Sequence, residues 1–344
     1  MSENQQVKLT MLMLLALLLM SNGVGNIHCS TLPENSTDML ALLDFRALIT
    51  DARGALTSWN TNMPYCKWRG ITCNPKNHGR VTAINLASQG LSGPIAASVG
   101  NLTLLHTLDL SDNQFSGQIP DLSNLQKMQV LKLSQNSLNG TIPDTLTNCS
   151  NLKELHLYTN FLEGAIPREI GFLKNLVLLG LSHNNLTGTI LPTVGNITHL
   201  DKLFLGYNQL EGRIPDELGQ LSNITIMDLA QNKLSGSIPE SLFNLSSLQQ
   251  LGLNVNQLSN KLPNDAGDRL SSLQTLMLDE NMLEGHLPDS LGNASMLEIV
   301  SFQDNNLTGR IPSSFGRLPR LSFLNLQINM LEAKDSESWE FMQR

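Results

Sequence analysis

The feature that most constrains this chain of 344 residues is a 16-residue phrase that recurs along most of its length. The phrase reads L-x-x-L-x-L-x-x-N-x-L-x-G-x-I-P and begins at Leu105. It returns, with substitutions, at Met128, Leu152, Leu176, Leu200, Ile224, Leu248, Leu273 and Leu297. A looser copy starts at Val81 and an incomplete one at Leu321, so the starts are 23 to 25 residues apart. A period in this range predicts a solenoid of stacked units.

Each position of the phrase has an expected role, shown here for the copy at 152–167. The Leu155-His156-Leu157 alternation predicts a short strand, and stacking such strands gives a parallel sheet. Asn160 occupies the step where the chain leaves the sheet, where its amide can bond backbone groups that the turn leaves unpaired. The same step predicts an asparagine ladder through Asn113, Asn136, Asn184, Asn208, Asn232, Asn256, Asn281, Asn305 and Asn329, with Gln89 in the first copy.

The G-x-I-P half predicts a second, irregular sheet-like edge followed by a short helical turn. Gly164 permits backbone geometry that a Cβ would hinder, and Pro167 ends the extended stretch because it has no amide donor. Three copies depart from the pattern, at Ala96, at Leu191 before Pro192, and at Asn260. We expect local distortion in those coils.

The N-terminal segment is typical of a secretory signal peptide. Residues 11–20 form an apolar stretch that is preceded by Lys8 and followed by small and polar residues. A membrane-spanning helix needs about 20 apolar residues, so this segment is too short for the alternative of an anchor. Cleavage after Gly25 or after Cys29 fits equally well, and we assign residues 1–29 to the signal peptide.

Ten Asn-x-Ser/Thr sequons follow this segment. Several arise from the repeat itself, but together with the signal peptide they favour the secretory route. The candidate glycosylation sites are Asn35, Asn101, Asn139, Asn148, Asn185, Asn196, Asn223, Asn244, Asn293 and Asn306.

Residues 30–80 precede the repeats at 81–344 and have the composition of a cap. Cys66 and Cys73 are close enough in sequence for one disulfide, whereas Cys149 is expected to be a small buried residue. Between Leu32 and Asn60 the apolar spacing predicts a short amphipathic helix. Its expected inward residues are Met39, Leu42, Leu43 and Ile49, with Ser36, Thr37 and Asp38 at the cap and first turn, and Trp59 and Trp68 bracketing the cysteine entry. Such a cap would cover the open end of the apolar core.

These motifs resemble a known family. The phrase, with S-L-F-N-L-S-S-L between copies, resembles the plant-specific leucine-rich repeat. The A-L-L-D-F helix, the S-W-N turn and the C-K-W-R-G-I-T-C box resemble the cap of plant leucine-rich-repeat receptor-like kinases, over residues 36–344. The W-E-F-M segment near the C-terminus is similar to an irregular repeat in the subgroup of immune receptors for bacterial flagellin and elongation factor.

The resemblance implies a leucine-rich-repeat solenoid of the α/β type, shaped as a horseshoe or superhelix. A parallel sheet would line the concave face, irregular or 3-10 segments the convex side, and a helical, disulfide-bonded cap the N-terminal end. Such receptors continue through more repeats, a C-terminal cysteine cap, one membrane helix and a cytoplasmic Ser/Thr kinase. This sequence has no glycine-rich loop with a following lysine and no H-R-D or D-F-G segment. We therefore expect a truncated product, a short isoform or an incomplete gene model that is not an enzyme.

Other chemistries fail on the arrangement of their residues. The seven histidines have no Cys or acidic neighbours at metal-ligand spacing, so we expect no metal and no cofactor. The formal charge of −8 and the absence of any basic run exclude a nucleic-acid partner.

Stacked strands offer a binding surface instead. Outward strand positions of neighbouring coils line up about 5 Å apart on a concave face. Aromatic residues are only 5% of the chain, and exposed ones are frequent interface anchors. The candidate ligand-binding residues are His156, Tyr158, His183, Lys202, Phe204, Tyr207, Asp228 and Met277. The alternative is that these aromatic residues lie on an exposed sheet by chance.

Two functional classes remain open at this stage. The first is the extracellular ligand-recognition part of a plant signalling or defence receptor, which binds a peptide or protein and a membrane co-receptor kinase. It would be secreted to the apoplast, or held at the plasma membrane as part of a longer receptor. The second is a secreted inhibitor that resembles the polygalacturonase-inhibiting proteins, and a non-functional fragment is the third possibility. The inhibitors end in a cysteine cap that this sequence lacks, which favours the receptor class.

Overall fold

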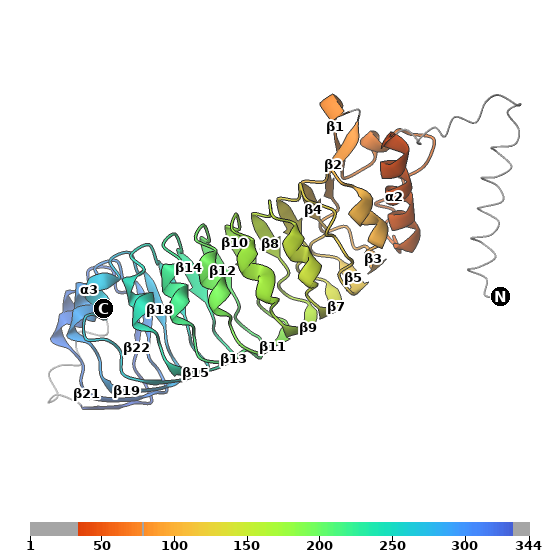
Figure 1. Ribbon diagram of the computed structural model, residues 1–344. Helices are drawn as coiled ribbons and strands as arrows, with labels where there is room; N and C mark the ends of the chain where they lie inside the picture. Colours follow the sequence, from red (N-terminus) through yellow and green to blue (C-terminus); the bar gives the residue numbers. More distant parts are fainter. Residues whose placement is uncertain (1–33, 78, 333–344) are drawn as a thin grey trace, which may run out of the picture.

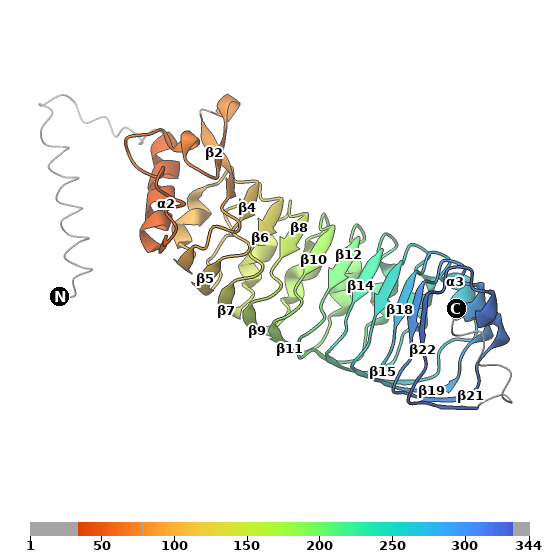
Figure 2. The ribbon, with the colours of Figure 1, turned by 180° about the vertical axis from the view of Figure 1, so that it is seen from behind.

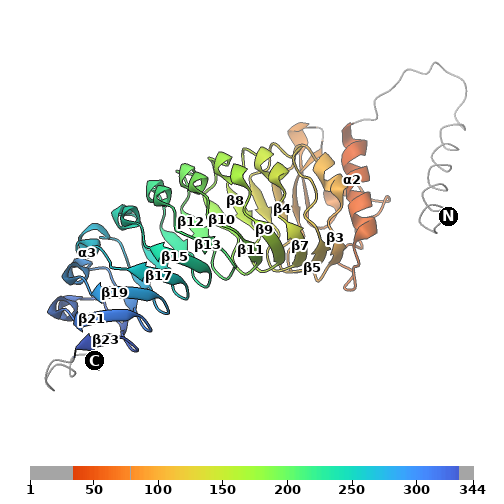
Figure 3. The ribbon, with the colours of Figure 1, turned by 60° about the horizontal axis from the view of Figure 1, so that its bottom comes forward.

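The computed structural model describes residues 34–77 and 79–332. The expected signal peptide at 1–29 and the W-E-F-M segment at 339–342 lie outside the described residues. The chain forms one elongated stack of coils that runs from an N-terminal helix to the last copy of the phrase (Figures 1 and 2). The stack curves along its length (Figure 3). This is the predicted solenoid, with one coil for each copy.

A sheet of twelve strands runs the length of the stack. Strand β1 (Ile71–Asn74) is antiparallel to β2 (Arg80–Asn85), and every later pairing is parallel. The later strands are β4 (Thr107–Asp109), β6 (Val130–Lys132), β8 (Glu154–His156), β10 (Leu178–Gly180), β12 (Lys202–Phe204), β14 (Ile226–Asp228), β16 (Gln250–Gly252), β18 (Thr275–Met277), β20 (Ile299–Ser301) and β22 (Phe323–Asn325). The register places Leu179 opposite both Leu155 and Leu203, so equivalent positions of the phrase are side by side. The main sheet lines the concave face, as predicted.

The G-x-I-P halves form two further parallel sheets. One contains β3 (Ser92–Pro94), β5 (Gln114–Gly117), β7 (Ser137–Thr141), β9 (Phe161–Ala165) and β11 (Asn185–Thr187). The other contains β13 (Glu211–Gly212), β15 (Lys233–Ser237), β17 (Gln257–Asn260), β19 (Met282–His286), β21 (Asn306–Arg310) and β23 (Met330–Glu332). The division falls between β11 and β13, in the coil where Leu191 occupies the proline position. An isolated bridge between Thr189 and Glu211 crosses it.

The distortion expected in the coil of Ala96 is not seen, whereas the coil that contains Asn260 departs from the others beyond that residue, at Ala266–Arg269. Ala96 has φ −66° and ψ 138°, close to the −64° and 131° of Pro143 at the equivalent position. Asn260 has φ 69°, in the left-handed region that Gly164 also occupies at 76°. Asparagine tolerates this region better than most residues, so it replaces glycine here with the same backbone conformation.

Short 3-10 helices complete most coils, as expected of the turn after the proline. They are η3 (Ala97–Asn101), η4 (Asp144–Asn148), η5 (Arg168–Phe172), η6 (Pro192–Asn196), η7 (Asp216–Gln220), η8 (Glu240–Asn244), η9 (Asp289–Asn293) and η10 (Ser313–Arg317). The coil from Leu248 has one extra residue and forms helix α3 (Ala266–Arg269) instead. The coil from Leu105 is one residue shorter and passes from β5 to β6 without such a helix. The turn therefore differs in the two coils whose length departs from 24 residues.

The asparagine ladder forms as predicted. Asn160 Nδ2 donates to the carbonyl of Leu133 in the preceding coil at 3.0 Å and to that of Leu157 at 3.1 Å. Its Oδ1 accepts a hydrogen bond from the backbone N–H of Leu138 at 3.0 Å. One side chain thus satisfies backbone groups in two coils, and the leucine positions pack into one continuous buried core.

The cap contains helix α2 (Glu34–Leu48), followed by η1 (Tyr65–Lys67) and η2 (Pro75–Asn77) around the cysteine loop. The helix begins earlier than the sequence suggested, so Ser36, Thr37 and Asp38 lie within it rather than at its cap. Its fully buried apolar residues are Ala41, Leu42 and Phe45, while Met39 and Leu43 are only partly buried and Ile49 lies beyond its end. The helical spacing was therefore predicted correctly, but the inward face was assigned partly to the wrong residues.

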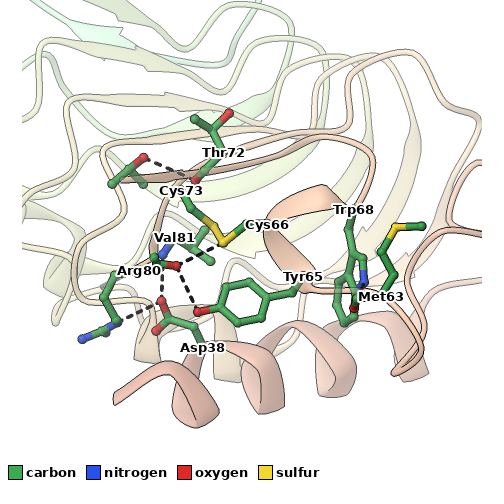
Figure 4. The surroundings of a disulfide bond; sticks show 11 residues. Asp38, Met63, Tyr65, Cys66, Trp68, Thr72, Cys73, Arg80 and Val81 are labelled. Atoms are coloured by element: carbon green, nitrogen blue, oxygen red, sulfur yellow. Dashed lines mark hydrogen bonds and ion pairs between the residues drawn. A yellow bond between two sulfur atoms is a disulfide. The ribbon is translucent and has the colours of Figure 1, made fainter. Parts of the chain in front are cut away.

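The cysteine loop is closed by the predicted disulfide between Cys66 and Cys73 (Figure 4). Trp59 and Trp68 stack with ring centroids 5.3 Å apart, and Phe45 stacks on Phe115 of the second coil at 6.1 Å. These rings join the cap to the repeats and cover the first coil. Cys149 is buried and free, as expected.

Candidate ligand-binding face

The side chains that point outward from the main sheet form a surface that we call the concave face. Parallel register aligns its central positions into one row across six strands, which consists of His156, Gly180, Phe204, Asp228, Gly252 and Met277. The four predicted residues in this row therefore share one line across neighbouring coils. Met277 is separated from Asp228 by the bare backbone of Gly252.

His183 and Tyr207 lie just beyond strands β10 and β12 and form a stacked pair. Their ring centroids are 4.0 Å apart and the ring planes differ by 17°. Both residues have φ 56°, the left-handed conformation that precedes every ladder asparagine from Asn113 to Asn329. Because the repeat places this conformation at the same point in each coil, the two rings project in parallel, and both are exposed to solvent. An exposed aromatic pair on adjacent coils is a suitable anchor for a ligand.

A second cluster lies two coils nearer the cap. His156 and Tyr158 meet edge to face at 6.0 Å, and His156 Nε2 lies 3.0 Å from Glu154 Oε2. Lys132 Nζ lies 3.4 Å from the same oxygen. Partial burial alone would raise the pKa of the Glu154 carboxyl, but the hydrogen bond from His156 and the charge of Lys132 outweigh it and lower the pKa. This charge is therefore already balanced within the protein.

Glycines shape the face around these side chains. A Cβ added to Gly180 would lie 3.4 Å from the Tyr158 ring, so the absence of a side chain gives that ring room. A Cβ on Gly206 would lie 2.9 Å from Asp228 Oδ2, and one on Gly252 would lie 3.2 Å from Asp228 Oδ1. The Asp228 carboxylate therefore lies between two stretches of backbone that carry no side chain.

The charge of the Asp228 carboxylate is not compensated by a lysine, as that of Glu154 is by Lys132. Burial raises the pKa of its carboxyl, and the hydrogen bond from the N–H of Ala230 at 3.0 Å and the nearby His183 only partly offset this. Within the described part of the chain, no Lys or Arg forms an ion pair with Asp228. Among these residues the carboxylate is thus partly desolvated and has no Lys or Arg as its partner.

The remaining predicted residues lie on the same face. Lys202 and Phe204 are half-buried on β12, in the same coil as Tyr207. Glu154 and Lys132, which complete the cluster around His156, were not among the candidates. Ile299 and Phe323 extend the exposed apolar surface toward the last coil and were also missed. Both occupy the first variable position of the L-x-L strand, so extending the same reading frame to the last two coils could have found them.

Neither a cluster of metal-binding side chains nor a membrane-spanning helix is found among the described residues. Nowhere in 34–77 or 79–332 do three or more His, Cys, Asp or Glu side chains gather closely enough to hold a metal ion. Over the same ranges no helix has the length and apolar content needed to cross a membrane. The features of the concave face that can contact a ligand are its shape, its aromatic rings and its charged side chains.

Comparison with protein families settles the class of the chain. The model described as leucine-rich repeat region matches residues 115–338, and the model of the leucine-rich repeat N-terminal domain matches residues 35–74. The chain belongs to the leucine-rich repeat family. Its relatives include the LRR receptor-like serine/threonine-protein kinases EFR and GSO2 of Arabidopsis thaliana. EFR is 43% identical over 89 residues, which is 25% of this chain and 8% of EFR. GSO2 is 38% identical over 172 residues, 48% of this chain and 11% of GSO2.

Solved leucine-rich repeat structures agree with the fold. The ectodomain of the Arabidopsis receptor kinase GASSHO1/SCHENGEN3, in complex with CASPARIAN STRIP INTEGRITY FACTOR 2, is 38% identical with a TM-score of 0.83, covering 86% of this chain and 36% of that one. The Arabidopsis HAESA ectodomain, with an IDA peptide hormone ligand, is 34% identical with a TM-score of 0.77, covering 87% and 50%. A plant ice-binding protein has a TM-score of 0.75 at 29% identity, covering 87% and 96%. Since one fold carries such different functions, function has to be argued from the surface.

Proposed function

We propose that this chain is the extracellular recognition module of a plant leucine-rich repeat receptor, which binds a peptide or protein ligand on its concave face. Residues 1–29 act as the signal peptide, 30–80 as the cap and 81–344 as the recognition solenoid. The observation that carries the proposal is the row from His156 to Met277, with the stacked His183–Tyr207 pair beside it. The similar HAESA ectodomain binds an IDA peptide hormone and the GASSHO1/SCHENGEN3 ectodomain binds CASPARIAN STRIP INTEGRITY FACTOR 2, which supports a peptide or protein ligand here.

The proposal assigns binding and no reaction. The chain spans about a tenth of the length of the curated receptor kinases that it matches, so their kinase activity is not carried over. A membrane co-receptor kinase is the second partner that the receptor class implies. The apoplast, or the plasma membrane as part of a longer receptor, is the corresponding location.

The environment of Asp228 favours a ligand that carries a positive charge. Its carboxylate is partly desolvated and has no Lys or Arg partner in the described chain, so a Lys or Arg side chain of the ligand would supply the missing charge. The same side chain could lie against the Tyr207 ring, which favours a cation at its face. The ligand is therefore a peptide with a basic residue at this point.

The test uses random peptides displayed on phage and selected on the full chain secreted from plant cells. Tyr158→Ala and Phe204→Ala should each weaken binding of the selected peptides by about tenfold or more, because buried aromatic anchors dominate such interfaces. Phe161→Ala and Phe172→Ala are matched controls, since these rings are 59% and 66% exposed on β9 and η5, away from the main sheet. Equal losses for both pairs, or none for the first, would contradict the assignment.

A further inference from the structure

A second regular row of residues lies along the 3-10 helices, which follow one another along one side of the stack (Figure 1). Five of these helices end on the asparagine of a sequon, at Asn101, Asn148, Asn196, Asn244 and Asn293. These asparagines are separated by 47 to 49 residues, which is two coils. The other coils that have a helix at this point end it on Phe172, Gln220, Arg269 and Arg317, none of which begins a sequon. The sequons therefore recur at every second coil.

The backbone presents all five in the same way. In each, the asparagine and the Ser or Thr are exposed, while the residue between them is buried in the core. In four of the five, the N–H of the Ser or Thr donates to the carbonyl of the asparagine, as Ser150 does to Asn148 at 2.8 Å. The middle residue has the φ and ψ of an inverse γ-turn, for example −75° and 63° at Cys149. A tight turn anchored by one buried side chain thus holds both ends of the sequon at the surface.

The amide nitrogens of this row are largely free for attachment. Asn101, Asn148 and Asn196 make no side-chain hydrogen bond within the described residues. Asn244 uses only its oxygen, which accepts from Arg269 Nη1 at 3.0 Å. Asn293 donates from Nδ2 to Asp268 at 2.7 Å, an exposed contact that leaves its second N–H unused.

Asn223 provides the contrast within the same chain. Its Nδ2 donates to the carbonyl of Thr198 in the preceding coil at 3.0 Å. Asn151 and Asn175 make the equivalent bonds to Gln126 and Ser150, at 2.6 Å and 2.9 Å. Asn223 therefore belongs to a second structural ladder, in which the amide nitrogen is bonded to the backbone of the preceding coil rather than to a side chain such as Asp268 that can move away.

An exposed apolar side chain lies between two of these sequons. Phe172 is 66% exposed at the position where the helices of the neighbouring coils on either side end on Asn148 and Asn196. Coils stack about 5 Å apart, so a substituent on either asparagine stands one coil from the Phe172 ring. Phe172 has the largest exposed fraction of the large apolar side chains in 34–77 and 79–332, and a bulky glycan attached one coil away can reach its ring.

We propose that Asn101, Asn148, Asn196, Asn244 and Asn293 carry N-linked oligosaccharides that form one row at every second coil, and that the glycans at Asn148 and Asn196 cover Phe172. The row leaves the concave face open, since none of the described sequon asparagines lies on a strand of the main sheet. The proposal requires the secretory route and does not depend on any ligand. N-linked oligosaccharides are bulky and hydrophilic, so they suit an exposed surface and can also cover an apolar ring.

Occupancy is tested on the full chain, secreted from plant cells and mapped by mass spectrometry after cleavage with peptide N-glycosidase. We expect all five row positions to be modified and Asn223 to be unmodified. Gln220→Asn completes a sequon with Ser222 at an intervening coil and should add one glycan, because the turn there has the same Ser222-to-Gln220 hydrogen bond at 2.9 Å. Unmodified row positions in the secreted protein, or a Gln220→Asn protein without the added glycan, would overturn the proposal.

Shielding is tested by aggregation of the folded protein. The pair Asn148→Gln and Asn196→Gln should raise light scattering at elevated concentration, and adding Phe172→Ser should reverse the rise. The pair Asn101→Gln and Asn293→Gln removes as many glycans away from Phe172 and should not. Enzymatic removal of the glycans from folded, purified protein gives the same comparison without any effect on folding in the cell. Equal scattering from the two pairs of variants would refute the shielding of Phe172. The proposed function is judged separately, since peptide binding should be unchanged in all of these variants.

Discussion

The Asp38 carboxylate on α2 accepts hydrogen bonds from Arg80 Nε at 2.9 Å and from the N–H of Val81 at 2.8 Å (Figure 4). This contact joins the cap to the first coil across 42 residues of sequence. Asp38 is fully buried and the Arg80 side chain is 8% exposed. A buried charge of this kind depends on its partner for compensation.

Replacing Asp38 by Ala should therefore destabilise the cap strongly. The change leaves the Arg80 charge and the Val81 N–H without this acceptor, at a cost of about 3–5 kcal/mol. Urea unfolding followed by the fluorescence of Trp59 and Trp68, both buried in the cap, measures the loss. Asp44→Ala changes an exposed carboxylate on the same helix and should shift stability by less than about 0.5 kcal/mol. An Asp38→Ala protein that unfolds with the control would show that the pair is dispensable.

This contact also marks a limit of sequence reasoning. Spacing correctly predicted a helix near Asp38, because apolar residues at helical intervals are visible locally. It placed Asp38 at the cap of that helix, whereas the carboxylate faces inward to a partner 42 residues away. The partner of a buried charge depends on how the cap packs on the first coil, which no local pattern encodes.

The repeat could be predicted more fully, since each position of the phrase has the same neighbours in every coil. The main sheet and the ladder from Asn113 to Asn329 follow from that regularity. The environment of Asp228 does not, because it depends on which residues the parallel register places beside it. Gly206 and Gly252 occupy variable positions in two different copies of the phrase. Only the register of the strands shows that both lie beside the Asp228 carboxylate.

Removing one ladder amide should destabilise the solenoid. Asn136 Nδ2 donates to the carbonyls of Leu110 and Leu133 at 3.0 Å, and its Oδ1 accepts from the N–H of Phe115 at 2.9 Å. Asn136→Ala leaves these buried groups unpaired, at a cost of about 1–3 kcal/mol. Ser137→Ala is the neighbouring, exposed control. Calorimetry should show a lower unfolding temperature for the first variant alone, and identical temperatures would contradict the ladder's role.

Cys149 should be chemically inert in the folded protein. Burial raises the pKa of its thiol to about 11, so little reactive thiolate exists at neutral pH, and the side chain is inaccessible. Iodoacetamide should modify Cys149 slowly before urea is added and rapidly afterwards, as measured by peptide mapping. Cys66 and Cys73 should stay unmodified until a reductant opens their disulfide. Fast modification of Cys149 in native protein would show that the coil around it opens.

Asp228→Asn should stabilise the fold and weaken ligand binding at the same time. Burial raises the pKa of Asp228 in the folded state, so the ionised carboxylate opposes folding at neutral pH and this penalty fades as the pH falls through the raised pKa. Asparagine keeps the oxygen that accepts from the N–H of Ala230 and removes the charge. The variant should gain up to about 1 kcal/mol at pH 7, and the gain should shrink in acid.

Peptides with a basic residue should bind the same variant less tightly, because the charge that they pair with is gone. Glu240→Gln, an exposed change on η8, matches the change in net charge and should alter neither property. Calorimetry across the pH range and titration with the selected peptides measure the two effects. Opposite signs are expected where a group is kept for binding at the expense of stability. Stabilisation with unchanged peptide affinity would remove Asp228 from the ligand site, and lower stability at pH 7 would contradict the raised pKa.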